Sequence, residues 1–313
     1  MNEQFGRKIS LILFTGENGL DVSEFRIRFH VSNADYESPN SLAIRVYNLS
    51  QQTIQKIQGE FSQVVLNAGY EEGNYGVIFQ GTIKQFRIGR ENNKDSFLDI
   101  FAADGDIGMN FGIVNKTLAA GSTPQDAIKA IVEAMPGISI DNFPDVIADK
   151  QHVPNLRGKT MFGMARARLR NLTSTLDYSW SIDNGKVILI PITGYLPGEA
   201  VKINSLTGMI GVPEQTDEGI KVTCLLNSKL RIGGLVQINN SDVVTLLQQN
   251  PDAAPIPYNQ WTGFQNNTPL SKDGTYRLYS VESEGDSRGK EWYSYLTLLA
   301  VDTSAPINNS VKP

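Results

Sequence analysis

Residues 219–238 read GIKVTCLLNSKLRIGGLVQI, and this stretch decides how the rest of the chain is interpreted. Its β-branched and apolar residues predict one strand over 219–226 and a second over 235–239. Between them, Gly233-Gly234 provides the backbone freedom for a turn or a bulge. The pattern alone indicates only a β-sheet. Its position matters more, because it opens the second of two β-rich blocks that look alike.

The composition excludes several classes of protein. A net charge of -5 argues against a nucleic-acid binder, which needs a basic surface, although a neutral wall would let a polyanion slide past. A single cysteine, Cys224, excludes an internal disulfide, and its place in a strand pattern favours a buried packing role over a nucleophile. No apolar run approaches the ~18 residues of a membrane span, so none is predicted.

The first block, residues 1–104, predicts an antiparallel β domain with one short helix. Strands are expected at 8–14, 24–31, 42–47, 64–69, 77–88 and 96–103, and a helix at 51–58. The clearest alternation is at 24–31, where apolar residues point one way and Arg26, Arg28 and His30 point the other. That strand should have one core face and one wet face, which makes His30 a solvated residue rather than a catalytic one.

Residues 105–200 predict a small α/β insert. Ser122-Thr123-Pro124 is typical of a helix start, and a second helix is expected at about 160–176. Arg166, Arg168 and Arg170 lie off its apolar stripe, which indicates a solvated face more than an anion site. A hairpin is predicted at 178–191, with its turn at Asn184-Gly185.

Residues 201–302 return to β structure, with further strands expected at 208–212, 276–284 and 291–302. The polar stretch 240–272 predicts a long surface loop, and 303–313 a flexible tail. The fold class is therefore mainly β: two similar antiparallel β-barrel or sandwich domains flank a helix-and-hairpin insert.

Two segments support a duplication. Residues 77–104 and 276–302 each read strand, charged turn, strand, and each ends in Ala-x-Asp. Coincidence between two hairpins is the alternative.

The last strand is apolar or aromatic on both faces, whereas a sheet in a free monomer usually leaves one face polar. It is therefore either central in a sandwich or covered by another subunit. The residues predicted for a subunit interface are Trp292, Tyr293, Tyr295 and Leu299.

Catalytic and metal-binding patterns are missing from the sequence. The two histidines, His30 and His152, are far apart, and the paired carboxylates Glu71-Glu72 and Asp217-Glu218 fall in predicted turns. No zinc, calcium, phosphate-loop or nucleophile-elbow motif occurs. We expect no catalytic residue, no metal and no cofactor, although carboxylates from separate loops can still meet in space.

Several segments together resemble the tail baseplate hub proteins of contractile-tailed phages, a group related to late-control tail proteins and to the hub half of secretion-system spike proteins. They are LAIRVYNLS at 42–50, VLNAGY at 65–70, IFQGTI at 78–83, the helix from Thr123-Pro124, the helix and hairpin over 160–191, and the opening stretch at 219–238. The resemblance covers nearly the whole chain.

The resemblance implies a structural protein of the virion tail baseplate, assembled in the host cytoplasm. A homotrimer with two tube-like domains per chain would form a pseudo-sixfold ring between the tail tube protein and a central spike protein, next to other baseplate proteins. Its channel would let DNA pass without binding it. Because the chain stops soon after the second β block, the spike is expected to be a separate chain.

Two other functions fit the sequence less well. A carbohydrate- or host-surface-binding protein could use Trp180, Trp261 or Trp292 for stacking, with Trp261 the one expected to be exposed. A cell-wall hydrolase would need carboxylates that the sequence does not reveal as a pair.

Overall fold

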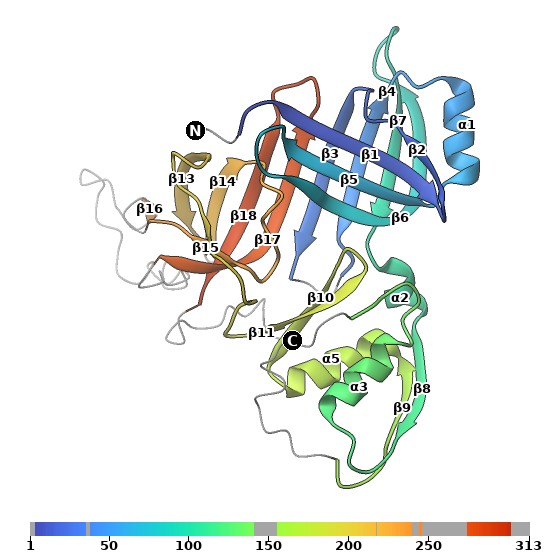
Figure 1. The fold of residues 1–313 in the computed structure, drawn as a ribbon, viewed down its shortest axis with the longest axis vertical. Coiled ribbons are helices and arrows are strands. Elements are labelled where there is room, and N and C mark those ends of the chain that lie inside the picture. The colour runs from blue at the N-terminus through green and yellow to red at the C-terminus, as the bar shows by residue number, and fades with distance from the viewer. Residues whose placement is uncertain are drawn as a thin grey trace, which may run out of the picture.

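The structure is a computed structural model that describes residues 4–35, 38–140, 155–216, 218–239, 244–245 and 274–301. Predictions for the 240–272 loop, the 303–313 tail, His152 and Trp261 fall wholly or almost wholly outside these residues. In the described part, β strands dominate and helices are short and few (Figure 1).

Most strands join one large sheet of fourteen strands. They are β1 (Arg7–Thr15), β2 (Asn18–Asp21), β3 (Ile27–Ala34), β4 (Ser41–Tyr47), β5 (Gln63–Tyr70), β6 (Tyr75–Arg90), β7 (Ser96–Ala103), β12 (Val201–Lys202), β13 (Met209–Gln215), β14 (Ile220–Leu225), β15 (Leu235–Gln237), β16 (Val244–Thr245), β17 (Thr275–Asp286) and β18 (Trp292–Ala300). The main path runs β16-β13-β14-β18-β17-β3-β4-β7-β6-β5-β1-β2, and all its pairs except β13–β16 are antiparallel.

The two β blocks meet within this sheet. Strand β17 of the second block pairs with β3 of the first, from Ser280 opposite Ala34 to Asp286 opposite Arg28. The path stays open from β16 to β2, so the barrel alternative is not seen among the described strands.

Three hydrophobic cores lie along the chain. The first lies where β1 and β5 cross over β3, β4 and β7 (Figure 1), and helix α1 (Gln51–Glu60), capped by Ser50, adds Ile54 and Ile57 to it. The second core fills the insert. The third is built mainly on β14, β15, β17 and β18.

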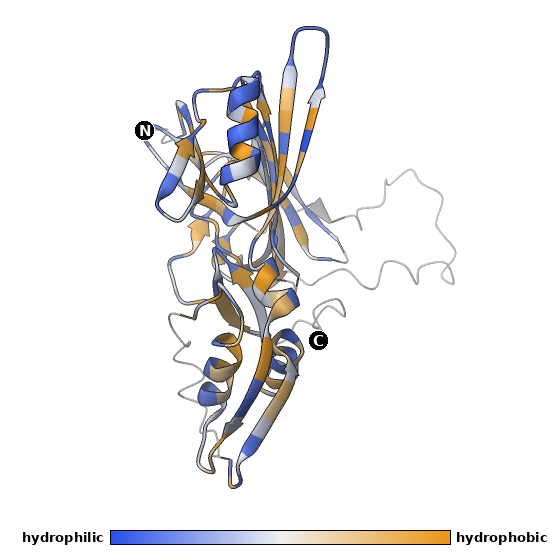
Figure 2. Cartoon of the chain, turned by 90° about the vertical axis from the view of Figure 1, so that its right-hand side faces the viewer, coloured by the Kyte–Doolittle hydropathy of each residue, from blue (hydrophilic) through white to orange (hydrophobic). Residues whose placement is uncertain are grey.

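The insert extends below the large sheet (Figure 2). It contains α2 (Asp106–Phe111), β8 (Ile113–Leu118), α3 (Pro124–Val132), β9 (Lys159–Met164), α5 (Ala165–Thr175), β10 (Tyr178–Asp183) and β11 (Lys186–Pro191). Thr123 and Asp126 form a reciprocal cap at the start of α3, which confirms the helix start predicted there. The β10–β11 hairpin with its Asn184-Gly185 turn is also confirmed.

The helix predicted at 160–176 is wrong in its first turn. Residues 159–164 form β9 instead and pair with β8 from Thr117 opposite Thr160 to Ile113 opposite Met164. Gly163 has a φ of 122°, a conformation outside the helical range. The helical stripe read from the sequence therefore merges a strand and a shorter helix.

Buried polar bonds fasten the insert to the sheet. The side chain of Arg277, 3% exposed, forms an ion pair with Asp35 at 3.3 Å and donates to the carbonyl oxygen of Pro191 at 2.9 Å. Asp104 accepts a 2.9 Å hydrogen bond from the Gly185 backbone N–H, and Asn40 donates to the Ile182 carbonyl at 2.8 Å. The hairpin is thus held by both β blocks.

Candidate functional site

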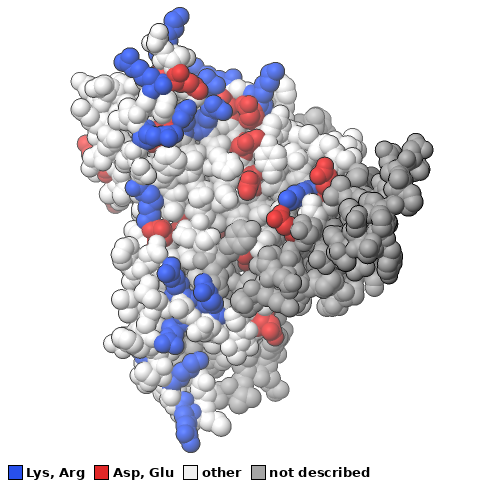
Figure 3. Space-filling model, turned by 180° about the vertical axis from the view of Figure 1, so that it is seen from behind, with Lys and Arg blue, Asp and Glu red and all other residues white. Residues whose placement is uncertain are grey.

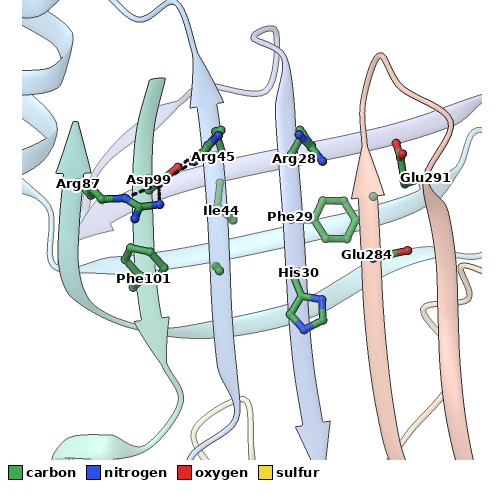
Figure 4. A pocket seen from close by; sticks show the side chains of 12 residues that line it. Arg28, Phe29, His30, Ile44, Arg45, Arg87, Asp99, Phe101, Glu284 and Glu291 are labelled. Atoms are coloured by element: carbon green, nitrogen blue, oxygen red, sulfur yellow. Dashed lines mark hydrogen bonds and ion pairs between the residues drawn. The ribbon is translucent and has the colours of Figure 1, made fainter. Parts of the chain in front are cut away.

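The most distinctive surface is the outer face of the large sheet where the two β blocks join. Strand alternation places Arg28 and His30 of β3, Arg45 of β4, Asp99 of β7 and Glu284 of β17 on this side. Seen from behind, charged groups of both signs gather on it (Figure 3). We call this surface the charged face. A shallow hollow of about 340 Å³ lies on it (Figure 4).

Asp99 is held by two arginines on neighbouring strands. Arg45 donates from Nε and Nη2 at 2.7 and 3.1 Å, and Arg87 donates from Nε and Nη2 at 2.9 and 2.6 Å (Figure 4). Burial alone would raise the pKa of Asp99, but the two guanidinium groups outweigh it and hold that pKa below its ordinary value. The carboxylate is therefore charged at neutral pH and offsets one of the two positive charges beside it.

Asp286 repeats this arrangement at the end of β17. Arg26 donates to both of its oxygens, at 3.2 and 2.6 Å, and Arg28 Nε lies 3.6 Å away. Burial opposes ionisation here too, and the bonds from Arg26 and the Arg288 backbone N–H lower the pKa of Asp286. Glu91 lies between Arg28 and Arg45, at 4.0 and 3.9 Å.

The charged face is balanced rather than basic. Its arginines also stack on aromatic rings, with Arg45 3.7 Å from the Phe97 centroid and Arg26 4.7 Å from that of Tyr47. Its charged side chains include Arg26, Arg28, Arg45 and Arg87 on the basic side and Glu91, Asp99, Glu282, Glu284, Asp286 and Glu291 on the acidic side. Such a surface presents fixed dipoles and little net charge.

The four residues predicted for a subunit interface fall in different environments. Trp292 is 1% exposed and packs edge-to-face on Phe29, with centroids 5.5 Å apart, so it belongs to the first core. Leu299 is also buried, and Tyr293 is partly exposed. Tyr295 is exposed, and its hydroxyl donates to Glu284; that bond, helped by burial, raises the pKa of Tyr295 to about 12.

The remaining sequence candidates carry no visible chemistry. Cys224 is buried, which confirms its packing role, and burial raises the pKa of its thiol to about 12. His30 is exposed at the hollow, as expected for a wet strand face. Trp180 and Trp292 are both buried, so neither offers a stacking surface. Within the described ranges, no three side chains are grouped to hold a metal ion, and no helix is long and apolar enough to cross a membrane.

The sequence indicated the wet face of β3 but not the two carboxylate–arginine clusters. Arg26 and Asp286 are 260 residues apart, so their meeting depends on the β17–β3 pairing. One local feature of the sequence indicates a buried ion pair at Asp99: this aspartate stands in an apolar strand, directly before Ile100 and Phe101. A buried aspartate is rare unless it is paired with a cation.

Comparison with solved structures identifies the fold as that of phage tail proteins. The chain is similar to a tail protein from Neisseria meningitidis MC58 (TM-score 0.55, 10% identity, 94% of this chain and 96% of that chain). It is also similar to the 43 kDa tail protein of prophage MuSo2 from Shewanella oneidensis (TM-score 0.57, 7% identity, 96% of this chain and 99% of that chain). A third similar structure is that of the E. coli c3393 protein (TM-score 0.54, 10% identity, 99% of this chain and 80% of that chain). That protein is a type VI secretion system component described as structurally similar to the T4 bacteriophage tail proteins gp27 and gp5.

The model of one protein family, baseplate hub gp41, matches residues 39–244. The chain belongs to this family, and it is a baseplate hub protein, a structural component of the phage tail. No curated protein sequence matches it. The resemblance noted in the sequence is thereby confirmed at the level of the family.

Proposed function

We propose that three copies of this chain form a pseudo-sixfold ring that joins the tail tube to the central spike, with the charged face lining a channel for DNA. The observation that carries the proposal is the continuous sheet through β17 and β3, which sets both β blocks side by side with one shared outer face. Two such blocks in each of three chains match the sixfold symmetry of a tube.

The division of the chain supports this arrangement. Each hydrophobic core is built mainly from one of three units, the tube-like domains at 1–104 and 201–302 and the insert at 105–200, and Leu226, Trp292 and Ile190 pack across their bounds. The β6–β7 and β17–β18 hairpins both have a charged turn, and each contains one register shift, between Ile83 and Gln85 and between Leu278 and Ser280. A duplicated tube-like unit accounts for both likenesses.

The charge balance of the charged face suits passage of DNA without binding. A protein that binds DNA replaces counterions with free lysines and arginines. Here Arg45 and Arg87 share Asp99, and Arg26 and Arg28 share Asp286. Glu91 lies against Arg28 and Arg45 as well, so carboxylates offset most of this positive charge. A polyanion moving along this wall would meet no strong trap.

The partners follow from this position in the tail. The ring would contact the tail tube protein on one side, a separate central spike protein on the other, and further baseplate proteins around it. Assembly would take place in the host cytoplasm before the tail is complete.

The test is the mass and symmetry of the purified protein. A species of three times 34.5 kDa, with threefold rings in electron micrographs, is the expected result. A chain that stays monomeric at high concentration, both alone and mixed with its tail tube protein, would contradict the proposal.

A further inference from the structure

One face of the β8–β9 ribbon is bare. The two strands pair only with each other, and their inner face packs into the insert core through Val114 and Met161. The register places Ile113 opposite Met164 and Asn115 opposite Phe162 on the other face. Ile113 and Phe162 are 60% and 64% exposed, which shows that no described element packs over that outer face.

The end of the bare face next to α2 is apolar, whereas its other end carries Thr117 and Thr160. Phe111, just before β8, is 69% exposed, and Ile107 of α2 is exposed beside it. We call Ile107, Phe111, Ile113 and Phe162 the flank patch. An exposed sheet face in a free monomer is usually polar, and a contiguous exposed apolar patch marks an interaction site.

Two arginines at the start of α5 border the flank patch. Arg168 donates to the Phe162 carbonyl at 2.8 and 2.5 Å, and Arg166 donates to Asn110 Oδ1 at 3.2 Å. Neither forms an ion pair with a carboxylate in the described part of the chain, unlike the arginines of the charged face. The patch therefore fits a partner surface that is apolar and acidic.

The position of the flank patch points to a second copy of this chain. Strands β8 and β9 lie on the side of the molecule that faces the viewer in Figure 2, whereas β13 lies on the opposite side in Figure 1. In the proposed ring each chain has one neighbour on either side, so these two opposite flanks are candidates for the surfaces that face neighbouring copies. We infer that the flank patch is a subunit contact of the ring; this rests on the proposed function.

The opposite flank carries a complementary surface. On β13, Ile210 and Val212 are exposed apolar side chains, and Glu214 is an exposed carboxylate on the same strand. A chain with net charge -5 offers further acidic groups to the arginines. Contact between two different surfaces, repeated head to tail, closes into a ring when the rotation between successive copies is a whole fraction of a turn, here one third.

The first test compares Phe162→Lys with Leu156→Lys. Both side chains are largely exposed, so both variants should unfold at the wild-type urea midpoint, and Leu156 precedes the far end of the ribbon, where Lys159 pairs with Leu118. Sedimentation should show that Phe162→Lys dissociates the trimer at concentrations at least about tenfold above wild type, and that Leu156→Lys does not.

The second test joins the two flanks covalently. Phe111→Cys combined with Val212→Cys should cross-link between copies with a short bis-maleimide, whereas either single variant should not, because the native Cys224 is buried. A wild-type trimer that Phe162→Lys leaves intact and that gives no 111–212 cross-link overturns this inference alone. A wild-type chain that stays monomeric overturns the proposed ring with it.

Discussion

At the scale of residues, the buried carboxylates of the charged face each have arginine partners. Asp99 and Asp286 are nearly inaccessible, yet arginines keep each carboxylate ionised. In the proposed channel, a surface of this kind would keep its polar character without holding a polyanion. The net charge of this surface should become more positive when one of these carboxylates is removed.

Replacing Asp99 with Asn should destabilise the protein at pH 7 by about 1–3 kcal/mol, because Arg45 and Arg87 lose a charged acceptor. The loss is limited since the side chain of Arg87 is 60% exposed and can be rehydrated. Urea unfolding measures the change, with Glu17→Gln, in an exposed turn, as the control. An Asp99→Asn variant as stable as that control would contradict the role of the cluster.

The same pair of proteins should show a defined pH dependence. The folded pKa of Asp99 is depressed, so its contribution is present above the unfolded value of about 3.9 and is lost as the pH falls through the folded value. The stability gap between wild type and Asp99→Asn should therefore be full at pH 7 and narrow below pH 4. A stability difference between wild type and Asp99→Asn that widens at low pH would contradict a lowered pKa of Asp99 in the folded protein.

Asp104 should behave in the opposite sense. Burial raises its pKa to about 7, against the hydrogen bond from Gly185, so its folded form favours the proton. Its stabilising contribution is present at low pH and is lost as the pH rises towards 7. Asp104→Asn, which keeps an acceptor for Gly185, should gain on the order of 2 kcal/mol at pH 8 and little at pH 4. Thermal melts at the two pH values test this; an equal effect at both would contradict it.

At the scale of elements, alternation and turn chemistry in the sequence predicted most strands correctly. The strand at 24–31 was expected to have one wet face, and that face now carries the charged side chains of β3. The strand β9 was wrongly predicted as the first turn of a helix, and the error has a physical cause. Ala165, Leu169 and Leu176 are buried at helical spacing, and apolar residues of the preceding strand happen to continue that spacing. The local sequence pattern cannot distinguish a strand followed by a short helix from one longer helix.

Strand β18 provides a contrast between two aromatic residues. Trp292→Ala should cost about 3–5 kcal/mol of folding free energy, because the ring is buried against Phe29. Tyr295→Ala should cost less than about 1 kcal/mol, because its ring is exposed on the charged face. Denaturant unfolding of the two variants distinguishes a core residue from a surface one. Equal losses would contradict these placements.

The Arg277–Asp35 pair holds β17, the end of β3 and the exit of β11 together. Arg277→Met should destabilise the protein by about 3–5 kcal/mol, because it leaves a buried carboxylate without its counterion. The double variant Arg277→Met with Asp35→Val should recover part of this loss. Calorimetry of the single and double variants gives the coupling; simple additivity would show that the pair does not act as a unit.

At the scale of the whole molecule, the sequence indicated two β blocks and an insert but not how the blocks meet. The β17–β3 pairing joins residues about 250 positions apart, and no local pattern specifies it. The cluster around Asp286 depends on this junction, so it could not be assembled from the sequence. The cluster around Asp99 depends instead on the register of β4 and β6 against β7, which alternation alone does not fix. The packing partner of Trp292 could not be named for the same reason, since Phe29 comes from the other block.

The most direct test of the account is a cryo-electron microscopy reconstruction of the assembled hub. It should show three chains in a ring, with Arg45, Arg87 and Asp99 lining the central opening and β13 beside the α2–β8 flank of the next chain. A ring with the charged face on its outside, or an assembly without threefold symmetry, would contradict it.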